Sequence, residues 1–181
     1  MNKHKADRKP SARHMTEQAI LRRIEFIINE ARCEDGFRDQ TITFAMRVVS
    51  NWCTLGNDAG AAEVKLKGRR MSREAYDLRV KYSSDLRKWA STTINEHQMP
   101  LDQFWKRIRG NKIPSPQEFL ADFQRWLMVT VTKHEDDKVR KLRDKDPIER
   151  YRLAGIEVGE IGDDGRWKPL VQSLPVYLTP D

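Results

Sequence analysis

The chain has 181 residues, of which 38% are hydrophobic and 34% are charged. This length suits a single domain with tails, and the apolar fraction suffices for one core beneath a heavily charged surface. The formal net charge of +7 and the isoelectric point near 9.5 favour polyanionic partners such as DNA, RNA or an anionic membrane surface. Because no stretch reaches the roughly 18 apolar residues that span a bilayer, and no signal peptide is recognisable, we expect a cytoplasmic protein without membrane insertion.

The first 14 residues contain five Lys/Arg, two His and one Asp, and they show no apolar periodicity. We expect a disordered basic tail there, either an arm that follows phosphate charge or a solubilising extension. The two cysteines, Cys33 and Cys53, fall within apolar helical patterns and have no Cys or His at zinc-finger spacing. Buried, reduced thiols are therefore predicted, with no structural zinc.

Apolar residues recur at steps of three and four along the N-terminal half, which predicts amphipathic helices. Thr16 is the expected N-cap of the first helix, which ends before Gly36. The second helix covers about residues 40–55 and, as the least polar one, should be central. A third helix opens at Ser72, and its apolar stripe predicts that it runs to about His97, where the helix dipole would favour an imidazolium.

A short fourth helix begins after Pro100 and should bury Trp105 while its basic side chains face solvent. Ser115 and Glu118 then have the spacing of a capping box, with Pro116 at the first helical position. The fifth helix that starts here is expected to continue into the charged segment 133–145. It would then project beyond the body of the domain, for roughly 40 Å in all.

Asp146 and Pro147 predict a further helix start, and that helix should end near Gly155. The sequence IEVGEIGDDGRWKPLV then predicts a β-hairpin around the turn GDDG. The expected fold is mainly α, a single helical domain of five or six helices over residues 15–155. Residues 156–181 would add a small C-terminal β-hairpin and an extended tail.

Residues 104–127, FWKRIRGNKIPSPQEFLADFQRWL, resemble the end of the phage-repressor type of helix-turn-helix domain. In that family a recognition helix ends in a basic turn containing Gly, and a capped helix follows. The resemblance stops upstream, where the family's short helix and turn Gly are missing and Pro100 stands at the start of the reading helix. We therefore do not assign the chain to that family.

The sequence holds no recognisable catalytic signature, and we expect neither a cofactor nor a metal. Residues 134–137 carry one His and three acids, but Lys138 occupies the place where a zinc-binding helix needs its second His. The acids around the predicted hairpin, from Glu157 to Asp164, allow a metal-dependent nuclease as a weaker alternative, although the compact acid-x-Lys element is absent. No Gly-rich phosphate loop is present. Nothing in the sequence supports an enzyme.

The favoured function is a non-enzymatic nucleic-acid-binding protein, an accessory or regulatory factor for DNA more than for RNA. Two basic clusters are the candidate contacts to the phosphate backbone: Lys65, Lys67, Arg69 and Arg70 in the first, and Lys106, Arg107, Arg109 and Lys112 in the second. The alternative is a protein–protein interaction module, an inhibitor or assembly factor, that uses the charged helix 133–145. The two clusters form one binding surface only if they lie side by side; scattered clusters would favour the interaction module.

Overall fold

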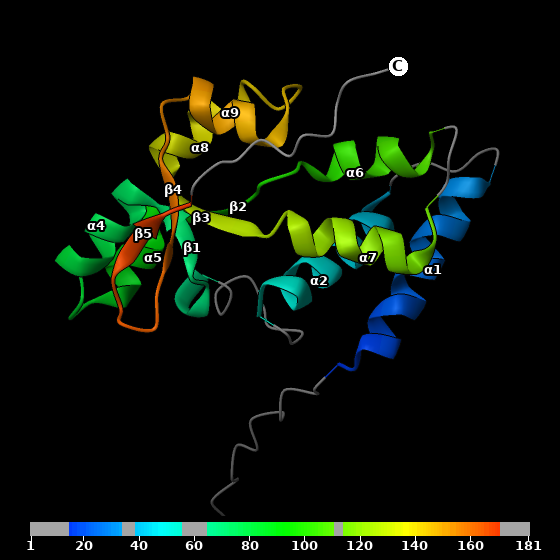
Figure 1. Cartoon of the computed structure of the whole chain (residues 1–181), viewed down its shortest axis with the longest axis horizontal. Coiled ribbons are helices and arrows are strands. Elements are labelled where there is room, and N and C mark those ends of the chain that lie inside the picture. Colours follow the sequence, from blue (N-terminus) through cyan, green and yellow to red (C-terminus); the bar gives the residue numbers. More distant parts are fainter. Residues whose placement is uncertain (1–14, 34–38, 56–64, 111–113, 171–181) are drawn as a thin grey trace, which may run out of the picture.

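The computed structural model describes residues 15–33, 39–55, 65–110 and 114–170. The described chain has two parts, a group of four packed helices and a five-stranded sheet with helices on both faces (Figure 1). Predicted features in residues 1–14 and 171–181 lie outside these ranges. Among the helices described, none is long and apolar enough to cross a membrane.

The helical part is built around apolar stripes whose spacing matches the helix period. It consists of α1 (Glu17–Arg32), α2 (Gln40–Leu55), α6 (Leu101–Ile108) and α7 (Pro116–Arg125). Ile20, Ile24 and Ile27 of α1 are completely buried in the shared core. In the same core Phe104 stacks on Phe123, with 4.2 Å between the ring centroids. The helix assigned to residues 40–55 is confirmed.

The sheet has the strand order β2-β3-β1-β4-β5. Its strands are β1 (Arg70–Ser72), β2 (Thr93–His97), β3 (Met128–Thr132), β4 (Val158–Ile161) and β5 (Trp167–Pro169). The central strand β1 runs parallel to β3 and antiparallel to β4, with Met71 opposite Thr130 and Ser72 opposite Val158. Within the described ranges, β2 pairs only with β3 and is an edge strand.

Helices cover both faces of this sheet. α8 (Lys133–Arg140) and α9 (Pro147–Leu153) enclose one core with Val129, Val131 and Val158. α4 (Arg73–Lys81) and α5 (Leu86–Thr92) enclose another with Met71 and Trp167. The sheet is thus buried on both sides, and every residue of β3 is buried.

Local capping signals are confirmed. The Ser115 hydroxyl accepts a hydrogen bond from the Glu118 amide at 3.2 Å, and the Glu118 carboxylate accepts one from the Ser115 amide at 2.7 Å. Thr16 caps α1, and Asp146 caps α9. Each of these contacts joins residues two or three positions apart, so sequence spacing alone specifies them.

Two predicted long helices are wrong. The helix expected from Ser72 to His97 divides into α4, α5 and strand β2, and the helix expected to run on from Pro116 stops at Arg125 and gives way to β3. The β-branched run Val129-Thr-Val-Thr favours a strand. Thr93–His97 becomes a strand because it pairs with β3 along its whole length. No projecting helix exists across residues 133–145; α8 packs against β2 and β3 and ends at Arg140.

The broad class, mainly α, is confirmed, whereas the expected count of five or six helices is wrong because the helices are shorter and more numerous. The C-terminal hairpin is confirmed as β4 and β5, but it is no separate appendage, since β4 pairs with β1 in the middle of the sheet. The prediction that both thiols are buried fails at Cys33. This residue follows the last turn of α1 and is exposed, while Cys53 is partly buried.

Candidate anion-binding site

A pocket of about 410 Å³ opens where α2 and the start of α6 meet the edge strand β2 and the helices α8 and α9. We call it the arginine pocket because four arginines line it: Arg47, Arg140, Arg143 and Arg150. Its polar lining consists of Arg47, Asn51, Asn95, Glu96, His97, Asp102, Asp136, Arg140, Arg143 and Arg150. The volume falls within the range of small-ligand sites.

The inner wall of the pocket holds a buried network of three residues. One carboxylate oxygen of Glu96 accepts a hydrogen bond from Nη2 of Arg150, and the other accepts one from the hydroxyl of Tyr151. The Arg150 side chain is 1% exposed and that of Glu96 is 11% exposed. Burial raises the pKa of Glu96, and the Arg150 charge opposes this. Burial and the adjacent Glu96 raise the pKa of Tyr151 well above its usual value, so its hydroxyl stays a neutral donor.

Arg150 has more hydrogen-bond donors than the described chain satisfies. Its Nε and Nη1 atoms are buried and have no hydrogen-bond partner among the described residues. Leaving a buried donor unpaired costs about 1–3 kcal/mol, and more for a charged group. Arg70 Nε and Trp126 Nε1 are also buried without a described partner, but only Arg150 has two such donors and lines a pocket. An anionic acceptor in the arginine pocket would satisfy them.

The other arginines of the pocket differ in how far they are engaged. Arg140 forms an ion pair with Asp136, at 2.8 Å between Nε and the carboxylate oxygen. Burial raises the pKa of Asp136, and Arg140 opposes this shift. Arg47 and Arg143 are exposed, and within the described ranges neither forms an ion pair. Two guanidinium groups therefore remain available at the mouth of the pocket.

His97 lies in the same pocket in its neutral form. Its Nδ1 is 3.2 Å from the Ser50 hydroxyl oxygen on α2. Burial first, and then the nearby charges of Arg47 and Arg150, lower the pKa of His97 to about 4. The imidazolium predicted at a helix end is wrong because the residue lies on a strand among arginines.

Side chains of the first predicted basic cluster, residues 65–70, contact other parts of the same chain. The Lys65 amine donates to the carbonyl oxygens of Ala90 at 2.9 Å and Thr93 at 2.7 Å, where α5 ends. Burial and the nearby Lys133 lower the pKa of Lys65. Lys67, which lies between Lys65 and Arg69 in the sequence, is exposed.

The arginines of that cluster contact the C-terminal hairpin and the loop after β2. Arg69 pairs with Asp163 at 2.7 Å and also donates to the carbonyl of Ile161. Arg70 donates to the Gln98 side chain at 3.2 Å. Asp164 pairs with Lys168 at 3.3 Å. Asp163 and Asp164 thus form ion pairs around the hairpin turn, and the described residues include no group of three or more potential ligands that could hold a metal.

The second predicted cluster extends from the arginine pocket along α6. Lys106 and Arg109 are exposed and follow Asp102, which lines the pocket, by four and seven residues. Helical spacing places all three on one face. Arg107 points elsewhere and pairs with Asp122 at 3.2 Å. Lys112 lies outside the described residues.

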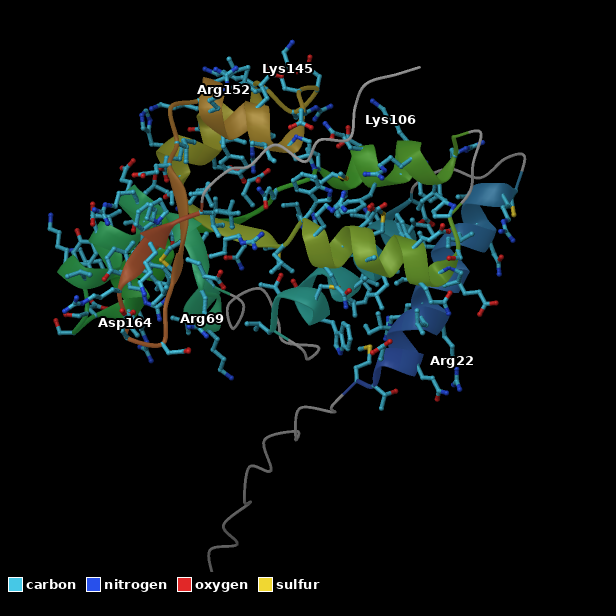
Figure 2. All side chains as sticks on the ribbon, viewed as in Figure 1. Arg22, Arg69, Lys106, Lys145, Arg152 and Asp164 are labelled. Carbon is cyan, nitrogen blue, oxygen red and sulfur yellow. The ribbon has the colours of Figure 1, made fainter. Side chains whose placement is uncertain are left out.

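The two predicted clusters do not share a surface. Figure 2 shows Lys106, Lys145 and Arg152 along one edge of the molecule, whereas Arg69 lies near the opposite edge with Asp164. The helix-turn-helix resemblance also ends here, because strand β2 precedes α6 where that family places a helix.

Sequence reasoning missed Arg47, Glu96, Arg143 and Arg150 as site residues. They come from four different elements or turns, and no spacing in the sequence relates them.

No protein-family model, curated protein or solved structure matches the chain.

Proposed function

We propose that this protein binds nucleic acid through the phosphate backbone at the arginine pocket, as a non-enzymatic accessory or regulatory factor. The observation that carries the proposal is the pair of buried Arg150 donors that have no hydrogen-bond partner among the described residues, in a pocket that also presents Arg47 and Arg143. A guanidinium group matches the geometry of phosphate oxygens and can donate two parallel hydrogen bonds to them.

The acids of the pocket offset this attraction only in part, because four arginines line it with three acids, Glu96, Asp102 and Asp136. Glu96 is engaged by Arg150 and Tyr151, and Asp136 is engaged by Arg140. Along α6, Lys106 and Arg109 continue the positive surface away from the pocket. Contacts of this kind give affinity and position without reading sequence.

The protein-interaction alternative depended on a projecting charged helix over residues 133–145. α8 instead packs on the sheet with Glu135, Asp136 and Val139 buried, so the helix does not project, although most of the other charged side chains of residues 133–145 face solvent. The two basic clusters are scattered, which by itself favours the interaction module and removes residues 65–70 from the proposed interface. We still place nucleic-acid binding first, because the arginine pocket takes their place and two donors of Arg150 have no partner among the described residues.

The test is fluorescence anisotropy with labelled oligonucleotides, single-stranded and duplex, across a salt series from about 50 mM. Reversing both mouth charges, Arg47→Glu with Arg143→Glu, should weaken binding at least tenfold and reduce the slope of log affinity against log salt by about 1–2. The matched control reverses two exposed arginines elsewhere, Arg22→Glu with Arg87→Glu, and should lose less than threefold. Negligible binding of either oligonucleotide at the lowest salt, or equal losses in both double variants, would refute the proposal.

A further inference from the structure

Phe44 on α2 is an exposed aromatic ring beside the arginine pocket. Its side chain is 64% exposed, more than any other large hydrophobic residue in the described ranges. It precedes Arg47 by three residues and Asn51 by seven, and both of these line the pocket. Helical geometry therefore places Phe44 on the face of α2 that leads to the pocket, one turn beyond Arg47.

A single exposed apolar side chain needs no explanation by itself. Here the neighbouring pocket supplies independent evidence of a ligand, because the buried Nε and Nη1 donors of Arg150 lack a described partner. A ligand that suits both features has an anionic group and a flat apolar group about one helical turn apart. A nucleotide unit of a polynucleotide has both.

We propose that the arginine pocket and Phe44 together bind single-stranded nucleic acid. A phosphate group enters the pocket and accepts hydrogen bonds from Arg150 and Arg47, and an adjacent unpaired base stacks on the Phe44 ring. This inference deepens the proposed function and rests on it.

Two features favour a single strand over a duplex. The bases of a duplex are stacked on each other, so an aromatic side chain can reach a base face only where the strand is unpaired. Arg150 is 1% exposed, and a phosphate on the convex surface of a stiff duplex could reach Arg47 and Arg143 but not the inner wall. A flexible single strand can bring one phosphate to the inner wall of the pocket, where Arg150 lies.

The test compares a labelled thymidine oligonucleotide with a hairpin duplex of the same number of nucleotides, at one salt concentration. The wild-type protein should bind the single strand more tightly. Stacking of a base on an aromatic ring is worth about 1–3 kcal/mol, so Phe44→Ala should weaken single-strand binding by about 5- to 150-fold and leave duplex binding unchanged. Phe44→Leu, which keeps an apolar side chain without a ring, should lose as much, whereas Phe44→Trp should retain the affinity.

Phe26→Ala is the matched control, because Phe26 is the other exposed phenylalanine of the described chain, 41% exposed on α1. It should leave both affinities unchanged. Since Phe44 is exposed, its variants should keep the wild-type melting temperature within a few degrees. Equal affinity for both oligonucleotides, or an unaltered single-strand affinity in Phe44→Ala, would overturn this inference. The proposed function would survive that outcome if Arg47 and Arg143 were still required.

Discussion

Glu96 on the edge strand and Arg150 on α9 lie 54 residues apart in the chain and form an ion pair at the inner wall of the pocket. The same carboxylate accepts a hydrogen bond from Tyr151. One acidic side chain thus connects the edge of the sheet to α9 and fixes the orientation of the guanidinium group that faces the pocket.

Replacing Arg150 by Met should destabilise the fold, because Glu96 would lose its charge partner while still buried. Removing one partner of a buried ion pair costs about 3–5 kcal/mol. The measurement is the free energy of unfolding in urea. The double variant Glu96→Gln with Arg150→Met should recover part of that loss. Arg152→Met on the same helix is the control: its pair with Glu149, at 3.4 Å, is exposed, and its loss should cost less than about 1 kcal/mol. Strictly additive losses in the double variant would show that the two side chains are not coupled.

The α6 face should contribute affinity but less than the pocket does. Reversing Lys106 and Arg109 together should lower the salt slope of nucleic-acid binding by about 1–2, with equal effects on different base sequences. Arg107→Met should change little, because Asp122 already engages that guanidinium group. Anisotropy titrations at several salt concentrations measure both quantities. An undiminished slope after the double reversal would confine binding to the pocket.

His97 should make the fold less stable in mild acid. Its pKa in the fold is about 4, below the ordinary value of 6.5, so the unfolded chain binds more protons between these values. The stability that the neutral imidazole contributes is complete above pH 6.5 and declines as the pH falls toward 4. We expect a decline of about 2 kcal/mol, less than the full shift implies because the pocket is open to solvent. Glu96 and Asp136 also titrate in acid, so the measurement is the difference between wild type and His97→Gln in urea unfolding at each pH. A constant difference across that range would contradict the neutral, buried state.

Gly159 should be intolerant of any side chain. A Cβ atom there would lie 2.2 Å from Cε2 of Trp167 and 2.4 Å from the Lys168 carbonyl oxygen. Trp167 cannot easily withdraw, because its indole N–H donates to the Met71 carbonyl at 3.1 Å. Gly159→Ala should therefore cost about 2 kcal/mol or more in unfolding free energy. Gly110→Ala, where the nearest atom is 3.3 Å away, should cost less than half as much. Similar losses of unfolding free energy in the two variants would contradict the close packing of Gly159 against Trp167.

The parts of the fold that sequence reasoning predicted depend on contacts within one or two helical turns. The capping box of Ser115 and Glu118 spans three residues, and the stripe of α1 repeats within one helix. The strand at Thr93–His97 was missed because its spacing continues the pattern of the preceding helix. Its pairing partner lies in β3, with Thr93 opposite Thr132, and no local signal encodes that register.

The candidate site was harder still to predict. A search for basic clusters finds neighbours in sequence, such as Arg69 and Arg70, whose side chains serve intramolecular contacts. The arginine pocket assembles residues as distant in sequence as Arg47 and Arg150, neither of which belongs to the two predicted basic clusters. Only the topology of the sheet and the helices around it brings them together.

The position of β1 has a consequence for the order of events during synthesis. β1 occupies the centre of the sheet, yet its partner in β3 emerges 59 residues after Met71, and its partner in β4 emerges 86 residues after Ser72. At about 5–20 residues per second, synthesis of the chain from β1 to β4 takes roughly 4–17 s. The segments of the helical part are complete by Arg125, before either partner strand has been made. We therefore expect the helices to fold before the sheet, so that the arginine pocket, which needs Arg150, forms only after the helical part is in place.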